Sequence, residues 1–377
     1  MGYFHFDVAD LADNISALRR EVREFISREL PATEDSGDGF CPGFSRKCGQ
    51  AGYIGMTWPR DYGGRERSYL ERHIVAEELL AAGAPIRAHW VADRQSGSML
   101  LKYGSDELCN KLLPEIVRGE CYFCIGMSEA NSGSDLFSIR SRAEKTGAGW
   151  RINGSKLWTS HAHRTHYMIA LLRTSTPAED DRRFGLTQFL IPMSAAGVTV
   201  RPITNLAGEH DFNEVLFEDV LLPDSHMLGK TDAGWKQVSD ELIYERSSPD
   251  RFLETISALY ELISLVEPHP EARAAEGIGR LAAQLSTLRH MSIATAAKLD
   301  RGGMPGMEAA IVKDLGTCWE QELPSVARDL VTFRPGEQHR AFDETCRRAM
   351  LLAPKLTIQG GTTEVLRGII ARGLGLR

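Results

Sequence analysis

At 377 residues, the chain is longer than one hydrophobic core usually supports, so two or three domains are expected. Its composition is that of an ordinary globular protein, with 42% hydrophobic and 25% charged residues. The formal net charge of −7 argues against nucleic acid as a partner, because phosphate binding needs a cationic face. No apolar run approaches the length of a membrane-spanning helix, and the first residues do not follow the pattern of a secretory signal.

The seven cysteines are odd in number and show no framework spacing, which predicts free thiols in a reducing cytoplasm. Cys121 and Cys124 form a C-x-x-C, but no second pair stands at a spacing suited to zinc. We therefore expect these two residues to be small apolar side chains in a strand.

Residues 1–120 are predicted to be a helical domain. An apolar stripe at helical spacing runs from Leu11 to Ile26, and Pro31 ends that helix. A second helical pattern covers about 69–82, and a third follows Ser105.

Residues 121–228 are predicted to be a middle β-barrel domain. Asn153-Gly154, between Trp150 and Trp158, is typical of a hairpin with a type I′ turn. Further β-like runs predict a small antiparallel domain that ends near Pro223; these runs are 166–174, 186–192, 197–203 and 213–220.

Residues 229–377 are predicted to be a C-terminal helical bundle domain. Its helical pattern is broken at Pro249, at 267–270, at 302–305 and at 334–336. The expected fold is mainly α with a central β-domain, in the order α, β-barrel, α, and the last domain is expected to be a four-helix bundle.

One segment suggests chemistry without reference to other proteins, namely Met127-Ser-Glu-Ala-Asn-Ser-Gly133-Ser134-Asp135. Small residues let the backbone approach a ligand closely, and clustered hydroxyls and amides can bind phosphate oxygens. An ordinary surface turn explains the composition equally well. No Walker or Rossmann glycine motif is present, which disfavours a standard nucleotide-binding fold.

Several motifs in order nevertheless resemble the acyl-CoA dehydrogenase family. The segment SEANSGSD followed by GWRINGSKLW is similar to that family's middle-domain signature. Gly55-Met-Thr-Trp-Pro59, Leu113-Pro114 with Gly119-Glu120, and Gly360-Gly-Thr-Thr-Glu364 resemble its N-terminal and C-terminal motifs. The resemblance implies the α–β–α fold, FAD as the cofactor, and α,β-dehydrogenation of an acyl-CoA or carrier-bound acyl thioester.

The resemblance also implies site residues. Met127 and Ser128 resemble the residues at the reactive edge of the flavin, and Trp158 resembles the tryptophan that covers one flavin face; an aromatic of the barrel core is the alternative for Trp158. The remaining cofactor residues implied in this way are Gly133, Ser134, Ser160, Gly361, Thr362 and Glu364. Ser134 and Arg246 are the expected substrate contacts.

The family implies that a Glu removes the α-proton of the thioester. Many members carry this Glu in the C-terminal loop, where this chain has Gly360. The isovaleryl and long-chain branches carry it on a helix in an L-x-x-E-R pattern, which Leu242-Ile-Tyr-Glu245-Arg246 matches. Glu245 is therefore the predicted base, and the backbone N–H of Gly360 is the predicted donor to the thioester carbonyl. The alternative is that Glu245 and Arg246 are a solvated helix pair.

Pro249 lies four residues after Glu245 and cannot donate a hydrogen bond to its carbonyl. The sequence predicts that the helix bends or restarts here, with Ser248 as its cap and Pro249 as its first residue.

Two family motifs that bind the ADP half of FAD, R-x-x-F-G and Q-x-x-G-G-x-G, are not found in this sequence. A homodimer or homotetramer is the family's usual assembly, but this departure leaves a heteromer open. The expected electron acceptor is an electron-transfer flavoprotein or another acceptor. A flavin oxidase or monooxygenase of the same fold and a non-catalytic subunit are the competing interpretations.

His161, His163 and His166 form a short cluster, and in a strand the first two would share one face. No carboxylate or Cys at useful spacing completes a metal-ligand set, so no metal is expected.

Overall fold

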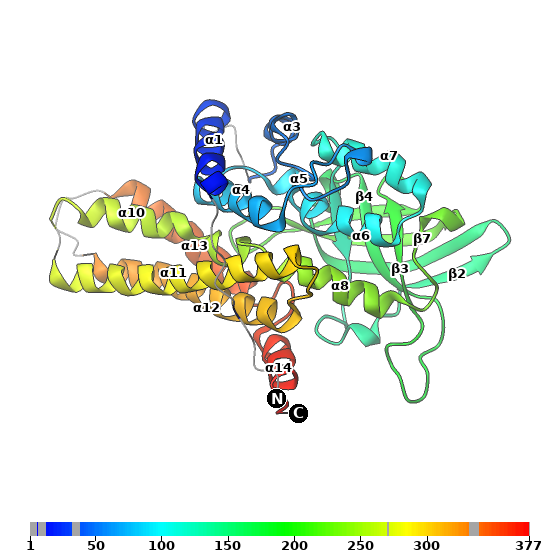
Figure 1. Ribbon diagram of the computed structural model, residues 1–377. Coiled ribbons are helices and arrows are strands. Elements are labelled where there is room, and N and C mark those ends of the chain that lie inside the picture. Colours follow the sequence, from blue (N-terminus) through cyan, green and yellow to red (C-terminus); the bar gives the residue numbers. More distant parts are fainter. Residues whose placement is uncertain (1–5, 7–12, 32–37, 270, 332–338, 377) are drawn as a thin grey trace. The chain divides into compact units, whose positions relative to one another are not determined.

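The structure, a computed structural model, describes residues 6, 13–31, 38–269, 271–331 and 339–376 (Figure 1). The chain forms two compact units. Unit 1 contains residues 1–28, 68–84 and 245–377, and unit 2 contains residues 29–67 and 85–244.

Unit 1 is helical. Its elements are α1 (Asp13–Glu29), α4 (Tyr69–Ala81), α9 (Asp250–Leu253), α10 (Ile256–Val266), α11 (Ala272–Asp300), α12 (Gly306–Leu330), α13 (Arg340–Leu356) and α14 (Thr363–Gly373). The two long helices α11 and α12 and the shorter α10 and α13 pack against one another as a four-helix bundle, as expected (Figure 1). Their apolar faces form one core, which includes Phe252, Leu259, Trp319, Leu323 and Phe342.

The boundaries of these helices follow the predicted breaks. The gap between α10 and α11 contains Pro268, and the gap between α11 and α12 contains Gly302 and Pro305. Proline removes a backbone donor and glycine permits a left-handed turn, so both end helices. The break predicted at 334–336 lies outside the described residues, as does Leu11 of the first apolar stripe.

His73 on α4 is buried in unit 1, near several arginine side chains. Its pKa is lowered to about 4, mainly by burial; Glu77 opposes this shift, and the guanidiniums of Arg289, Arg72 and Arg19 add to it. The imidazole is therefore neutral in the folded protein at neutral pH.

We expect His73 to make the folded protein sensitive to acid. Its folded pKa lies below the ordinary value of 6.5, so between pH 6.5 and about 4 only the unfolded chain binds this proton. Across that window, the free energy of unfolding should fall by up to about 3 kcal/mol as the pH falls. Urea unfolding of His73→Gln at stepped pH should show a flatter decline, whereas the exposed His290→Gln should decline like the parent. Equal slopes in all three proteins would contradict this account.

Unit 2 combines short helices with one large sheet. Its helices are α3 (Pro42–Ala51), η1 (Arg60–Tyr62), α5 (Arg87–Val91), η2 (Ala92–Ser96, a π-helical turn), α6 (Gly97–Tyr103), α7 (Asp106–Val117), η3 (Leu136–Ser138), η4 (Ala162–Arg164) and η5 (Asp224–His226). Ser105 caps α7 by accepting a hydrogen bond from the N–H of Leu108, which confirms the helix predicted there.

The sheet has eight strands in the order β6-β7-β3-β2-β4-β5-β8, and β1 pairs with β4. The strands are β1 (Phe123–Gly126), β2 (Arg142–Thr146), β3 (Gly149–Ser160), β4 (Tyr167–Arg173), β5 (Leu186–Pro192), β6 (Val198–Ile203), β7 (Phe212–Leu222) and β8 (Met227–Leu228). The four β-like runs predicted from 166 to 220 are therefore strands, namely β4, β5, β6 and β7. The expectation of a purely antiparallel domain was wrong, because β1 and β2 each pair with β4 in parallel.

The prediction of a hairpin at Asn153-Gly154 was also wrong. Strand β3 continues through both residues, and the hairpin to β2 turns at 147–148 instead. Gly154 has φ of +137° at an irregularity in the pairing with β7, and a Cβ there would lie 2.4 Å from the hydroxyl of Ser141. Gly154 therefore allows close packing at a β-bulge and does not form a turn.

Helix α8 (Gly234–Arg246) contains the predicted base and ends near Pro249 as expected. The chain restarts as α9 at Asp250, with Pro249 in the cap position, one residue earlier than predicted for this proline. The predicted capping role of Ser248 was wrong, because α9 has no side-chain cap hydrogen bond. The boundary between the two units falls within α8, between Tyr244 and Glu245.

Candidate active site

The loop after β1 is held in place by a buried lysine. The Nζ of Lys156 donates to the carbonyl of Met127 at 3.1 Å and to the carboxylate of Glu129 at 2.8 Å. The N–H of Leu157 donates to the carbonyl of Ser128 at 2.9 Å. Glu129 also accepts hydrogen bonds from the backbone N–H groups of Arg140 and Ser141. Met127 and Ser128, the residues predicted to face the flavin, therefore lie on a rigidly supported backbone.

Lys156 is fully buried, and burial lowers its pKa to about 8 even though Glu129 opposes the shift. We expect Lys156→Met to lower the free energy of unfolding by about 3 kcal/mol, because it leaves the carboxylate of Glu129 without its cation. Urea unfolding should show this loss, and the double variant with Glu129→Gln should recover part of it. Lys145→Met, which removes an exposed ion pair with Asp224, should change stability by less than about 1 kcal/mol. A similar loss in both lysine variants would contradict this role.

The rest of the loop is open. Gly133 and Ser134 are exposed, and a Cβ added to Gly133 would meet nothing within 4 Å. A cavity of about 320 Å³ lies beside the loop and is lined by Glu129, Asn131, Ser132, Arg140, Ser141 and Ser155, among others. A glycine without steric restriction, next to hydroxyls and backbone amides, suits close approach by a phosphate-bearing ligand.

Trp158 lies on the surface of unit 2 with a side chain that is 57% exposed, which excludes the barrel-core alternative. Its φ of +61° is left-handed, and the pairing of β3 with β7 is irregular between Lys156 and Thr159. The irregularity presents the indole to solvent while Phe212 packs edge-on against it, with ring centroids 5.9 Å apart. An exposed Trp in an unfavourable backbone conformation is typical of a ligand-binding position. Ser160, at the end of β3, is exposed as well.

Glu245 is buried in the last turn of α8, in unit 1. One carboxylate oxygen, Oε1, lies 3.0 Å from Nη2 of Arg251, whose side chain is 3% exposed. Arg246 is buried too, and burial lowers its pKa. The alternative of a solvated helix pair is therefore wrong.

The loop that contains Gly360 and Gly361 lies directly against Glu245. A Cβ added to Gly360 would lie 2.5 Å from Oε2 and 2.6 Å from Oε1 of Glu245. Two buried cations hold the loop carbonyls. Nε of Arg246 donates to the carbonyl of Gly360 at 2.8 Å, and Nζ of Lys313 donates to that of Gly361 at 2.8 Å. Burial, followed by the charge of Arg251, lowers the pKa of Lys313 to about 8.

Thr362 and Glu364 follow this loop at the start of α14. The hydroxyl of Thr362 caps the helix by accepting a hydrogen bond from the N–H of Val365 at 3.4 Å, and Glu364 is exposed in the first turn. Lys313 and Arg251 complete this part of unit 1. Neither belongs to a sequence motif, so their contacts with the loop and with Glu245 could be found only in the folded structure.

The three histidines do not form one cluster. They lie in and around the short turn η4 rather than in a strand, and His161 itself has a left-handed φ of +54°. His163 stacks on His210 with ring centroids 3.9 Å apart, whereas His166 stacks on Tyr122 and accepts a hydrogen bond from its backbone N–H.

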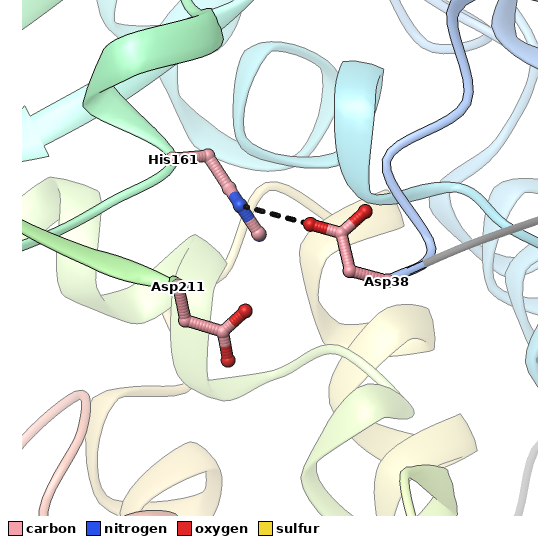
Figure 2. Close-up of side chains that lie close together, drawn as sticks. All are labelled: Asp38, His161 and Asp211. Carbon is pink, nitrogen blue, oxygen red and sulfur yellow. Dashed lines mark ion pairs between the residues drawn. The ribbon is translucent and has the colours of Figure 1, made fainter. Parts of the chain in front are cut away.

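His161 instead lies near Asp38 and Asp211, two carboxylates that are distant in sequence (Figure 2). One potential ligand atom from each residue lies within 4.8 Å of the others, an arrangement that sequence spacing did not reveal. Arg164 donates to both oxygens of Asp38, at 2.9 and 2.8 Å, and Arg87 approaches Asp211 at 3.9 Å. These two guanidiniums balance the two carboxylates, and burial lowers the pKa of His161 to about 4. We interpret the group as a set of ion pairs around a neutral imidazole.

The residues of unit 2 fit FAD, the cofactor that the family resemblance implies. An exposed indole is available to cover a flat ring, and an unobstructed glycine lies within a hydroxyl-rich loop next to a cavity. Met127, Ser128, Gly133, Ser134, Trp158 and Ser160 all lie in this unit.

Comparison with known proteins identifies the family of the chain. Family models for the N-terminal, middle and C-terminal domains of acyl-CoA dehydrogenases match residues 12–120, 124–220 and 273–375. Acyl-CoA dehydrogenase IpdE1 from Mycolicibacterium smegmatis is 30% identical, over 96% of this chain and 98% of that protein.

Solved structures agree with this result. The Tcur3481-Tcur3483 steroid ACAD superposes with a TM-score of 0.87 at 26% identity, over 98% of this chain and 99% of that one. The ChsE4-ChsE5 complex from Mycobacterium tuberculosis gives a TM-score of 0.85 at 25% identity, over 98% and 99% of the two chains. The chain therefore belongs to the acyl-CoA dehydrogenase family, whose members are FAD-dependent oxidoreductases that act on CH–CH groups.

Proposed function

We propose that this protein oxidises an acyl-CoA to the trans-enoyl thioester, with Glu245 as the base that removes the α-proton. The observation that supports this most strongly is the contact between Glu245 and Gly360. Many relatives carry the base at the loop position of Gly360. In this chain the carboxylate oxygens of Glu245 lie where a side chain at position 360 would begin. A carboxylate on α8 therefore lies beside the loop position that carries the base in those relatives.

The chemistry requires this carboxylate and a hydrogen-bond donor to act together. Glu245 takes the α-proton, and the electron pair of that C–H bond forms the new double bond. The N–H of Gly360 stabilises the negative charge that develops on the thioester carbonyl, and the cations on the carbonyls of Gly360 and Gly361 keep this loop rigid. With FAD bound, the β-hydrogen would leave with its electron pair as a hydride, for which the flavin would supply the acceptor.

The remaining predicted residues have the following proposed roles. Met127, Ser128, Trp158 and Ser160 contact the flavin ring, and Gly133 and Ser134 contact the pyrophosphate or the acyl-CoA. Gly361, Thr362 and Glu364 bind the cofactor from the C-terminal loop, and Arg246 contacts the substrate in addition to holding the carbonyl of Gly360.

The proposed substrate class is a bulky, ring-bearing acyl-CoA. The name of the steroid ACAD supports this class, and the position of the base on α8 agrees with the branched, long or bulky substrates of relatives with a helix-borne base. A carrier-protein-bound acyl group is the second candidate for the thioester.

We also propose that the protein forms a heteromer with a second subunit of different sequence. The two motifs that bind the ADP half of FAD are missing from its sequence, and the ChsE4-ChsE5 structure is a complex of two differently named chains. An electron-transfer flavoprotein is the proposed acceptor. The described residues include no helix with the length and apolar content to cross a bilayer, and seven unbridged cysteines fit a cytoplasmic location.

Anaerobic mixing of the flavin-loaded protein with a panel of acyl-CoAs tests the function. The panel should include straight-chain, branched and steroid-derived acyl groups, with and without the candidate partner chain. Loss of the visible flavin absorbance, and a product lighter by two hydrogens, would support dehydrogenation, and the fastest substrate would indicate the class. No bleaching with any thioester would refute the proposal, and rapid peroxide formation in air would favour the oxidase alternative.

A further inference from the structure

Arg251 is a buried arginine in unit 1 that no family motif contains. It lies on α9, its side chain is 3% exposed, and Nη2 contacts two carboxylates, Oε1 of Glu245 at 3.0 Å and Oδ2 of Asp250 at 2.8 Å. A guanidinium is a rigid, planar donor, so it restricts the orientation of a carboxylate more than a flexible ammonium does.

The break in the helix makes this contact possible. Residues six positions apart do not face each other on a continuous α-helix, because neighbours on one face are three or four apart. Here α8 ends at Arg246 and α9 begins at Asp250, so the regular helical repeat is interrupted between Glu245 and Arg251. The proline that interrupts the helix therefore allows the guanidinium to reach the carboxylate.

The surrounding charges leave Arg251 available to Glu245 and Asp250. Burial alone would lower the pKa of Arg251, but Asp250 and Glu245, followed by Glu254 and Glu320, raise it well above its ordinary value. Burial and the nearby Glu254 raise the pKa of Glu320 well above the usual range, which favours its protonated form and weakens its competition with Glu245 and Asp250 for the guanidinium.

We propose that Arg251 is a positioning residue that fixes the carboxylate of Glu245 against the backbone of Gly360. The contact orients Oε1, and Gly360 limits movement of the carboxylate, because both oxygens lie within 2.6 Å of the place that a Cβ of residue 360 would take. This inference rests on the proposed role of Glu245 as the base. It adds a residue that acts on the α-proton through Glu245 without touching the substrate.

Proton exchange isolates this role from the oxidation step. In 3-thiaoctanoyl-CoA, sulfur replaces the β-carbon, so the α-proton can exchange with solvent but no β-hydride is available. Exchange in D₂O, followed by mass spectrometry, should be about 100-fold slower in Arg251→Gln and about 10-fold slower in Arg251→Lys than in the parent. The lysine variant keeps the charge but loses the planar fork, so it should restore part of the rate. The KM for the thioester should stay within about twofold in both.

A structural control separates positioning from folding. Glu320→Gln alters the same buried cluster but leaves the contact between Arg251 and Glu245 in place, so it should exchange protons at the parent rate. Melting temperature and FAD content should be measured for each variant. If Arg251→Lys exchanges protons more slowly with an unchanged KM, the result supports the proposal even if Arg251→Gln does not fold. Exchange at the parent rate in Arg251→Lys, or exchange slowed equally in Glu320→Gln, would overturn it.

The outcome for Glu245→Gln distinguishes this proposal from the proposed function. Exchange that is lost in Glu245→Gln but unchanged in both Arg251 variants would refute the role of Arg251 alone. Equal exchange in the parent and Glu245→Gln would refute Glu245 as the base, and the proposed role of Arg251 would fail with it.

Discussion

Glu245→Gln is expected to reduce the rate of flavin reduction by acyl-CoA about 1000-fold or more. The amide keeps the shape of the side chain and can still accept a hydrogen bond from Arg251, but it cannot accept the α-proton. General bases typically contribute 10²–10⁴-fold to a rate, and this α-proton is too weakly acidic to leave without one. Stopped-flow loss of flavin absorbance under anaerobic conditions measures the effect directly.

The matched control for this variant is Glu241→Gln, one turn earlier on α8. Glu241 is fully buried and accepts hydrogen bonds from the amides of Gln95 and Gln188, at 2.9 and 2.7 Å. Its replacement should lower stability but keep the rate within about tenfold of the parent. Thioester affinity in Glu245→Gln should be close to that of the parent, because the acyl-CoA contacts are intact. A Glu245→Gln protein that still reduces its flavin at a tenth of the parent rate would exclude Glu245 as the base.

Gly360→Ala is expected to slow the same reaction about 100-fold. The new methyl group would lie 2.5 Å from the Glu245 carboxylate, so the base or the loop must move, and a displacement of about 1 Å can cost this much. The residue has φ of +70°, which an L side chain adopts at a cost of about 1 kcal/mol. Stopped-flow rates and urea unfolding should be measured on the same preparations.

Gly302→Ala separates backbone strain from the clash. Gly302 has a similar φ of +76°, but a Cβ there meets nothing within 4 Å. Gly302→Ala should lose about as much free energy of unfolding from strain as Gly360→Ala, and its flavin should be reduced at the parent rate. Equal rates for Gly360→Ala and the parent would show that the close contact with Glu245 is unimportant, and an equal slowing in both variants would assign the effect to strain.

The family, the fold and the candidate base could be predicted from the sequence because each depends on local patterns. Helical spacing identified α1 and α4, a start signal at Ser105 identified α7, β-like runs identified β4 to β7, and the L-x-x-E-R pattern selected Glu245. The boundaries at 120 and 228 remain predictions.

Tertiary structure decided the features that depend on residues distant along the chain. Asn153-Gly154 has the local signature of a turn, but Ser141 and the pairing with β7 make it a bulge within a long strand. The three histidines are close in sequence, yet each packs against a different partner.

The candidate active site shows the same division. The sequence by itself led to the prediction that Glu245 on a helix takes the place of a glutamate in the loop, because both positions lie in recognisable motifs. Only the tertiary structure decided that Gly360 lies against that glutamate, that Lys313 holds the loop, and that Arg251 contacts the carboxylate. These contacts join segments as much as 115 residues apart (Glu245 and Gly360) or cross a helix break. Burial strengthens the interactions of their charges, and burial is a property of the folded chain.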